Sequence, residues 1–208
     1  MKIAILGGTG SFGGALAKRL VELGHDEIVI GSRDAGRARD TAASLGCAGG
    51  DTNDRCVVGV DLAILAVKAE AALDTTREVA DALGSTPLLS VASALSFAKD
   101  GVRPDPDARS LAERIQALVA GPVVAGLHSI AAANLDEAPP GEDALVCGDD
   151  REAKELVLEL VGRLVDGRAI DVGPLAGART LEGLTAVIVN VNRRYKVHAG
   201  VRVTGFDS

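Results

Sequence analysis

The sequence predicts an α/β fold, with a mostly parallel, doubly wound sheet and a small C-terminal cap. Short apolar runs alternate along the chain with amphipathic segments of helical length, which is typical of βαβ units. Hydrophobic residues make up 47% of the 208 residues and aromatic residues only 2%, so aliphatic side chains must build the core. No linker rich in Gly, Ser or charge divides the chain, which favours a single domain of residues 1–208.

The predicted strands are short apolar runs, of which residues 61–67 are apolar almost throughout, as in a strand buried on both faces of a sheet. They lie at residues 2–6, 27–30, 61–67, 87–91, 122–127, 144–147 and 168–172, with a short final strand at 200–204. The predicted helices lie at residues 14–23, 36–45, 70–83, 110–119, 151–165 and 180–194. Residues 46–54 and 99–108 are rich in Gly, Pro or Asp and are expected to be loops. Residues from about 144 to 208 are expected to form a C-terminal extension of the domain.

The bulk composition excludes several classes of function. The formal net charge of −7, without a basic cluster, argues against a nucleic-acid partner. Cys47, Cys56 and Cys147 lack the spacing of zinc ligands or a redox pair, so we expect reduced thiols and no metal site. No apolar run reaches the roughly 18 residues of a membrane span, and the chain enters its first strand without a signal peptide. We therefore expect a cytoplasmic protein that does not contact membranes.

The first predicted strand is followed by Gly8-x-Gly10-x-x-Gly13 and then by an amphipathic helix. Such a turn brings backbone N–H groups and the positive end of the helix dipole to a pyrophosphate. The motif alone is common, but the strand before it and the helix after it are the context that a dinucleotide site requires. We therefore expect a Rossmann-type dinucleotide site, with a plain β–α turn as the alternative.

The end of the second predicted strand indicates which dinucleotide binds. Sites for NAD place an acidic residue there for the ribose hydroxyls, whereas sites for NADP place small polar and basic residues there. This chain has Ser32 and Arg33 at that position, and Arg37 follows within about a turn. Arginine binds phosphate through a planar fork of charged donors. Asp34 is the one contrary residue, and a solvated basic turn is the alternative, but the pattern favours NADP(H).

Other segments form a pattern that a general dinucleotide site does not demand. The segments are Leu-Gly-Gly-Thr-Gly at 6–10, Val-Ile-Gly-Ser-Arg at 29–33, Ala-Gly-Leu-His-Ser-Ile-Ala-Ala at 125–132, Val-Cys-Gly-Asp-Asp at 146–150, Asp-Val-Gly-Pro-Leu at 171–175 and Glu-Gly-Leu-Thr at 182–185. The segments around Cys147 and Pro174 are the most specific. Through them the chain resembles, nearly from end to end, the NADPH-dependent F420 reductases, also called 8-hydroxy-5-deazaflavin:NADP oxidoreductases.

This resemblance implies hydride transfer between NADPH and the deazaflavin coenzyme F420, bound in a cleft at the carboxyl ends of the strands. The residues that it places around the pyrophosphate and ribose are Gly8, Thr9, Gly10, Ser11 and Phe12, with Ser32 and Arg33 at the 2′-phosphate and Val67 and Lys68 near the nicotinamide. Around the deazaflavin it places Ser90, Val91, Ala92, His128, Ser129 and Ile130, with Ala199 and Gly200 in a C-terminal segment that closes the pocket. Better-known archaeal members carry Pro-Trp where this chain has Lys68-Ala69, so Lys68 is alternatively a contact of a phosphate or of the acidic coenzyme tail.

The resemblance also implies a homodimer. The predicted helix at 180–194 carries an apolar stripe that is wide for a small domain to bury on one side. The stripe consists of Leu181, Leu184, Val187, Ile188 and Val191. A second subunit would cover part of it.

Hydride transfer between two carriers needs neither a nucleophile nor a general base from the protein, only orientation and exclusion of water. No residue is therefore required as an acid or base, and His128 is the candidate polar contact of the deazaflavin ring, with a structural histidine as the alternative. The Asp149-Asp150 pair is interpreted as a helix cap. Two other functions stay open: an NADP-dependent reductase of a small metabolite, and a non-catalytic NADP sensor.

Overall fold

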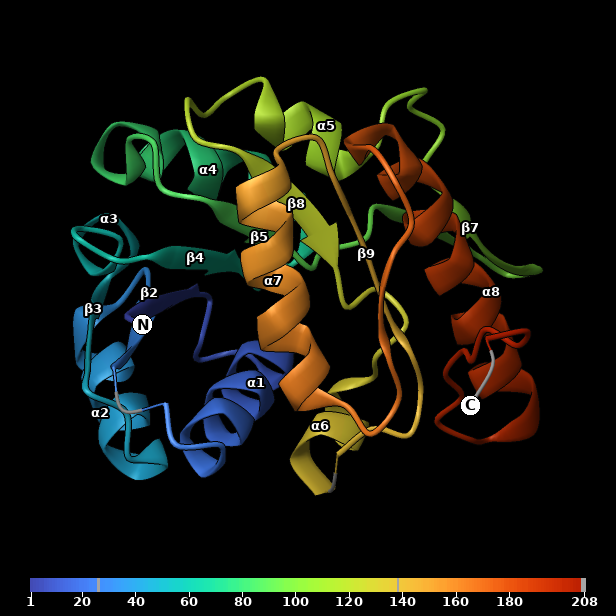
Figure 1. The fold of residues 1–208 in the computed structure, drawn as a ribbon, viewed down its shortest axis with the longest axis horizontal. Coiled ribbons are helices and arrows are strands. Elements are labelled where there is room, and N and C mark those ends of the chain that lie inside the picture. Colours follow the sequence, from blue (N-terminus) through green and yellow to red (C-terminus); the bar gives the residue numbers. More distant parts are fainter. Residues whose placement is uncertain (26, 138, 207–208) are drawn as a thin grey trace.

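An eight-stranded sheet forms the centre of the protein, and helices cover both of its faces (Figure 1). The computed structural model describes residues 1–25, 27–137 and 139–206. The strand order is β10-β9-β8-β5-β4-β1-β2-β3. All pairings are parallel except β8 with β9, which is antiparallel. The predicted doubly wound, mostly parallel α/β fold is thus confirmed.

The elements of the sheet and its helices follow the predicted alternation. The strands of the main sheet are β1 (Ile3–Leu6), β2 (Ile28–Ser32), β3 (Gly49–Thr52), β4 (Leu62–Leu65), β5 (Leu88–Ser90), β8 (Val123–Gly126), β9 (Ala144–Gly148) and β10 (Ala169–Asp171). The helices are α1 (Ser11–Glu22), α2 (Ala35–Leu45), α3 (Asn53–Cys56), α4 (Ala69–Leu83), α5 (Leu111–Gln116), α6 (Ala132–Glu137), α7 (Arg151–Leu164) and α8 (Ala178–Tyr195). A 3₁₀ turn (Leu175–Gly177) precedes α8, and a hairpin of β6 (Leu95–Ala98) and β7 (Gly101–Pro104) stands apart from the sheet.

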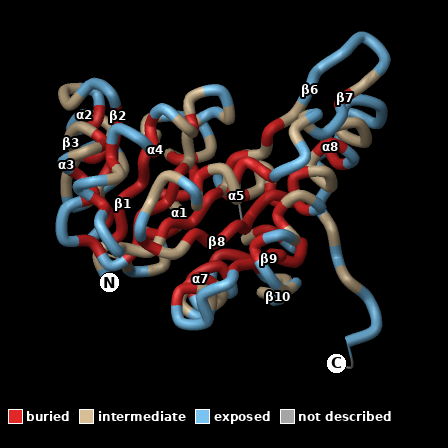
Figure 2. Tube along the Cα trace, turned by 90° about the horizontal axis from the view of Figure 1, so that it is seen from above, coloured by how far each residue is buried: buried red, intermediate tan, exposed pale blue. Residues whose placement is uncertain are grey.

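The core consists of two apolar layers, one on each side of the sheet. Along β1, Ile3 and Ile5 contribute to the layer under α1, α2 and α7. Ala4 and Leu6 contribute to the layer under α4, α5 and the start of α8. All four side chains are fully buried, which explains why the strand is apolar without interruption. Figure 2 shows this buried centre between the more exposed α2 and β3 at one end and α8 with the β6–β7 hairpin at the other.

Three local predictions are wrong. Residues 46–54 form β3 and α3 rather than a loop, because Gly50 is needed for packing: a Cβ there would lie 2.3 Å from the carbonyl oxygen of Ala38 on α2. Residues 99–108 are not only a loop, since 101–104 form strand β7 of the hairpin. Residues 200–204 form no strand; the carboxylate of Asp143 accepts the N–H of Val203 in place of a strand partner. None of the described helices has the length and apolar character needed to cross a bilayer.

The two aspartates of the Cys-Gly-Asp-Asp segment have structural partners. Asp150 caps α7 by accepting the N–H of Ala153 at 2.8 Å. Asp149 accepts the N–H of Leu175 at 2.9 Å and so fixes the turn before α8. The cap interpretation of this pair is confirmed for Asp150.

Helix α8 is joined to α5 through a buried carboxyl group. Glu182 has no exposed surface, and its Oε1 accepts the N–H of Leu111 at 2.7 Å and that of Ala112 at 3.4 Å. Its Oε2 has no partner among the described residues. Burial raises the pKa of Glu182 to about 7, against the opposing effect of the backbone N–H groups. The protonated form is therefore favoured by folding.

We expect Glu182→Gln to stabilise the protein above neutral pH. The folded pKa exceeds the unfolded one, so the wild type loses stability as the pH rises from about 4.5 to about 7. Glutamine keeps an acceptor for Leu111 and does not ionise. The gain in free energy of unfolding should be near zero at pH 4.5 and reach about 3 kcal/mol above pH 7. Denaturant unfolding of both proteins across this range measures it, and a gain independent of pH would contradict the assignment.

Candidate functional site

A cavity of about 560 Å³ opens at the carboxyl ends of β1, β2 and β4. Ligands of open α/β sheets bind at this edge of the sheet. The lining residues are Gly7, Thr9, Gly10, Ser11, Phe12, Ser32, Arg33, Arg37, Asn53, Ala66, Val67, Lys68, Ala71 and Thr75. Of the residues predicted for the nucleotide, all but Gly8 lie on this surface. Gly8 is buried directly behind it, where a Cβ would meet Ile30 at 3.0 Å.

The turn between β1 and α1 depends on close backbone packing. Gly7 has a φ of 77°, in the left-handed region that favours glycine, and a Cβ there would lie 2.7 Å from Val67 Cγ1. Gly13, on the first turn of α1, approaches so closely that a Cβ would lie 2.6 Å from the carbonyl oxygen of Gly7. Helix, turn and strand end are therefore held in one arrangement, with the start of α1 against the cavity.

The start of α1 is free to bind an anion. Its cap residue, Gly10, provides no side-chain hydrogen bond, and the first turn contains no acidic residue. The helix starts at Ser11, three residues earlier than predicted, so the first N–H groups of the helix belong to the part of the chain that lines the cavity. These unpaired donors and the helix dipole fit a pyrophosphate.

The basic end of the cavity lies at the end of β2. Ser32 is buried, while Arg33 and Arg37 are exposed, and no carboxylate of the described residues pairs with either guanidinium. Asp34, the contrary residue in the sequence, caps α2 by accepting the N–H of Arg37 at 3.1 Å. Its carboxylate is thereby engaged by the backbone, and two arginines stay available for a phosphate.

Val67 and Lys68 form the opposite side of the cavity, after β4. Val67 is half-buried against the glycine turn, and Lys68 is the exposed residue at the start of α4. Lys68 is therefore exposed to solvent at the mouth of the cavity, and its charged side chain does not provide a flat apolar surface there.

The residues predicted for the second ring follow β5 and β8, which are neighbours in the sheet. Ser90, Ala92, His128, Ser129 and Ile130 are all buried, and Val91 is half-buried; none belongs to the lining of the 560 Å³ cavity. The two groups thus follow strands that end at the same edge of the sheet, and the second group contacts α8, since Thr185 Oγ1 donates to the carbonyl of His128.

His128 is the most unusual of these residues. It is 6% exposed, and neither ring nitrogen has a well-formed hydrogen bond to a described residue. Burial lowers the pKa of His128 to about 4, so the ring is uncharged at neutral pH. His128 follows Leu127, whose backbone φ of 62° is rare for a residue other than glycine. The backbone carbonyl of His128 accepts from Thr185 Oγ1 at 3.0 Å, which ties this strand end to α8.

Ala199 and Gly200 do not line the 560 Å³ cavity. The N–H of Ala199 donates to Asn192 Oδ1 at 2.7 Å, and a Cβ on Gly200 would lie 2.6 Å from the Cβ of Glu142. This segment packs against the connection between β8 and β9, beyond the end of α8 (Figure 1).

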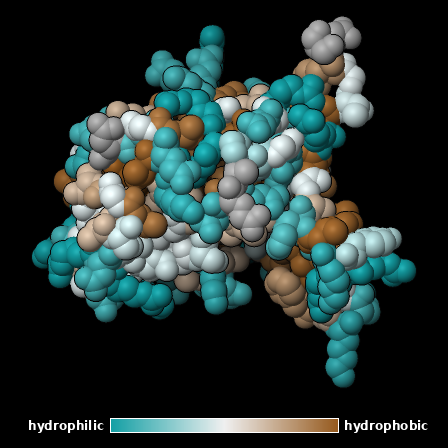
Figure 3. Space-filling view, turned by 90° about the horizontal axis from the view of Figure 1, so that it is seen from below, coloured by the Kyte–Doolittle hydropathy of each residue, from teal (hydrophilic) through white to brown (hydrophobic). Residues whose placement is uncertain are grey.

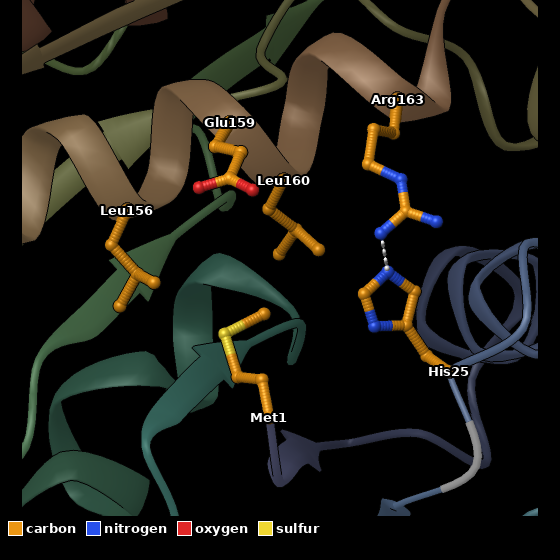
Figure 4. A pocket seen from close by; sticks show the side chains of 6 residues that line it. All are labelled: Met1, His25, Leu156, Glu159, Leu160 and Arg163. Carbon is orange, nitrogen blue, oxygen red and sulfur yellow. Dashed lines mark hydrogen bonds between the residues drawn. The ribbon is translucent and has the colours of Figure 1, made fainter.

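A second hollow, of about 360 Å³, lies between α7 and the start of β1 (Figure 4). Leu156 and Leu160 of α7 line it together with Met1. Arg163 spans its edge, where Nη1 lies 3.2 Å from Nε2 of His25 and Nη2 donates to the carbonyl of Leu23 at 2.9 Å. This hollow is at the amino end of β1, away from the strand ends that carry the dinucleotide motif.

Five residues of the cavity were not predicted for the nucleotide: Gly7, Asn53, Ala66, Ala71 and Thr75. Ala71 and Thr75 are four residues apart on α4, so their shared face was readable from helical spacing. Asn53 follows β3, a strand that the sequence did not predict, and no signal pointed to it.

Comparison with known proteins decides the family. A family described as "NADP oxidoreductase coenzyme F420-dependent" matches residues 2–94. An F420-dependent NADP reductase from Methanocaldococcus jannaschii is 33% identical over the full length of both chains. The enzyme of that name from Methanothermobacter marburgensis is 35% identical over 98% of each chain. This chain belongs to the F420-dependent NADP reductase family.

The solved structures agree with this family. A crystal structure from Arthrobacter sp. FB24, described as a candidate F420-dependent NADP reductase, superimposes with a TM-score of 0.86 and 25% identity, covering 99% of this chain and all of the other. A pyrroline carboxylate reductase from Plasmodium falciparum, with NADP bound, shares the fold at a TM-score of 0.64 and 14% identity. This chain spans only 64% of that longer protein.

We expect Gly10→Val to abolish binding of both NADPH and NADH while leaving the fold intact. Gly10 is exposed with an ordinary φ of −84°, and a Cβ would meet only the carbonyl of Gly7, at 3.2 Å. The branched side chain would fill the space in which a phosphate approaches the backbone. Fluorescence titration with each cofactor and a thermal unfolding scan measure the two effects. Normal NADPH affinity in this variant would move the site elsewhere.

Arg33→Ala should weaken NADPH binding by about 1–3 kcal/mol, the range for a hydrogen bond to a charged group. Binding of NADH should change little, because NADH lacks the 2′-phosphate. Isothermal titration with both cofactors measures the difference. Equal losses for both would mean that Arg33 acts on the structure of the turn and not on the phosphate.

Proposed function

We propose that this protein transfers a hydride between NADPH and coenzyme F420, in the cytoplasm and as a homodimer. The family uses NADP(H) and F420. One observation carries the proposal for this chain: a cavity with a basic end lies at the edge of the sheet at which β5 and β8 also end, and buried, uncharged polar groups follow those two strands. Such an arrangement suits two planar carriers that exchange a hydride more than it suits hydrolysis or group transfer.

When bound, NADPH would supply the hydride, and a proton from solvent would complete the two-electron reduction of F420. The glycine turn and the start of α1 bind the pyrophosphate, and Arg33 and Arg37 bind the 2′-phosphate. These contacts fix the remote parts of the cofactor so that the nicotinamide lies beside Val67. The second ring would bind at the end of β5, where Ser90 and Ala92 have small side chains. His128, held neutral by burial, offers a polar contact to that ring without placing a charge beside the reacting atoms.

The two alternative functions find less support. The solved reductases and dehydrogenases of small metabolites that share this fold with the protein are longer chains, of which it covers about 56–66%. Their sequence identity to this chain is 14–19%, against 33–35% for the F420-dependent NADP reductases. A non-catalytic NADP sensor would not need unpaired polar groups beside the cofactor cavity, and Ser90 Oγ and both nitrogens of His128 are unpaired and buried.

The homodimer rests on the outer surface of α8 and the hairpin. Leu181 and Ile188 of the predicted stripe pack into the core, but Val187 is 57% exposed, and Phe97 of β6 is 67% exposed. Side-chain contacts join the two elements, since Asn190 of α8 bonds to the backbone of Val102 in β7. On the face shown in Figure 3, apolar residues reach the surface in separate patches among hydrophilic ones. A second copy on α8 would cover Val187 and Phe97.

Mixing the purified protein with NADPH and oxidised F420 should bleach the visible absorbance of F420, reversibly and with one NADPH consumed per F420. Ordinary flavin should be a poor acceptor. His128→Ala should slow the transfer without changing the affinity for NADPH, because the ring belongs to the second site. If NADPH binds tightly and no acceptor is reduced, the sensor function replaces this one.

Light scattering at micromolar concentration should give twice the chain mass of 21.1 kDa. Val187→Glu should shift the mass toward that of a single chain, because a charge would be buried in the interface. Glu70→Gln, on the exposed side of α4, is the control and should stay dimeric. A single-chain mass for the wild type would assign the stripe to the core alone.

A further inference from the structure

Asn53 is a buried polar residue of the cavity to which the proposed function gives no role. It is the first residue of α3, directly after β3, and is 2% exposed. Asn53 is among the residues that line the cavity, and its buried Oδ1 has no hydrogen-bond partner among the described residues. An unpaired, buried amide oxygen costs about 1–3 kcal/mol, so such a group in a binding cavity indicates a missing partner.

The position of Asn53 is set by the end of β2. In the register of β2 and β3, Ser32 lies opposite Thr52, the residue before Asn53. Gly31 leaves the space that Asn53 fills, since a Cβ there would lie 2.9 Å from Asn53 Oδ1. The carboxamide is therefore packed beside the strand end that carries Ser32 and Arg33, on the side of the cavity assigned to the 2′-phosphate.

The chemical groups expected at the end of β2 indicate which hydrogen-bond donor Asn53 Oδ1 would receive. In NAD sites an acidic residue at the end of β2 accepts hydrogen bonds from the ribose hydroxyls. Here Ser32 stands at the strand end, and the ribose that carries the 2′-phosphate has lost the usual acceptor for its 3′-hydroxyl. An ionised phosphate offers only acceptors and cannot satisfy an amide oxygen. A ribose hydroxyl can donate a hydrogen bond to the amide oxygen. An amide beside a phosphate also avoids the electrostatic repulsion that a carboxylate would cause.

We propose that Asn53 is a further cofactor-binding residue, whose carboxamide accepts a hydrogen bond from the 3′-hydroxyl of the adenosine ribose. Asn53 thereby replaces, from the neighbouring strand and without charge, the acidic residue of NAD sites. It contributes to the preference for NADPH because it holds the ribose without opposing the 2′-phosphate. The inference rests on the proposed placement of NADP in this cavity.

Two substitutions that keep the number and branching of the side-chain heavy atoms separate this role from a structural one. Asn53→Leu removes the acceptor and should weaken NADPH and NADH about tenfold each, since both carry the 3′-hydroxyl. Asn53→Asp keeps an acceptor but adds a negative charge. It should weaken NADPH at least tenfold and leave NADH unchanged or tighter, so the ratio of the two dissociation constants shifts toward NADH. Isothermal titration with each cofactor measures both.

Asn190→Leu is the matched control. It also replaces asparagine by leucine, but on α8, where it removes two hydrogen bonds to Val102 of the hairpin. It should leave both affinities unchanged even if the melting temperature falls. Normal NADPH affinity in Asn53→Leu, or equal losses of NADPH and NADH in Asn53→Asp, would overturn the proposal. If Arg33→Ala has its expected selective effect while the Asn53 variants bind normally, only the role of Asn53 fails. If Arg33→Ala also has no effect, the placement of the cofactor fails.

A measurement on the wild type does not depend on the folding of any variant. NADPH lacking the 3′-hydroxyl should bind about tenfold more weakly than NADPH. NADPH in which the 6-amino group of adenine is replaced by oxygen should bind as NADPH does. Equal affinity for the 3′-deoxy cofactor, or a loss confined to the analogue altered in the base, would overturn the assignment to the ribose.

Discussion

The close contact between the start of α1 and the β1–α1 turn is the constraint on which the site depends. A Cβ at Gly13 would overlap the carbonyl of Gly7, and a Cβ at Gly7 would overlap Val67 after β4. These contacts fix the turn, the first helical N–H groups and the end of a second strand relative to one another. The N–H groups proposed to bind the phosphates and Val67, the residue proposed to lie beside the nicotinamide, are consequently parts of one packed unit, and the distance between them is set by the backbone and not by flexible side chains.

The sequence predicted most of this unit because its signals are local. Glycine spacing, apolar strands and helical periodicity lie within short stretches, so the order of strands and helices and the location of the nucleotide residues followed from them. The error at residues 46–54 arose because a glycine there has a tertiary role. Gly49 and Gly50 suggest a loop, yet they form β3 because α2 packs against the bare backbone of Gly50. With β3 missed, Asn53 had no predicted strand end to follow.

The second half of the site was harder to predict for a different reason. His128, Thr185 and Ser93 are far apart in the sequence, but Thr185 Oγ1 lies 2.9 Å from Ser93 Oγ and 3.0 Å from the carbonyl oxygen of His128. These contacts depend on how α8 crosses the ends of β5 and β8, and no periodicity within the chain encodes that crossing. The family resemblance named His128, whereas its neutral state follows from burial that only the structure displays.

The unpaired polar atoms of the core are concentrated at the carboxyl edge of the sheet. Among the described residues seven buried side-chain atoms have no partner, and all but Arg19 Nε belong to residues at or above this edge: Asn53, Ser90, His128, Arg179 and Glu182. Elsewhere the protein follows the general rule that buried polar groups are satisfied. Each unpaired atom lowers the stability of the free protein, and a ligand that supplies its partner recovers that free energy on binding. If the two carriers bind as proposed, Asn53 at the ribose and Ser90 and His128 beside the second ring would each gain a partner, so the groups that cost stability in the free protein would raise the affinity for the carriers and orient them.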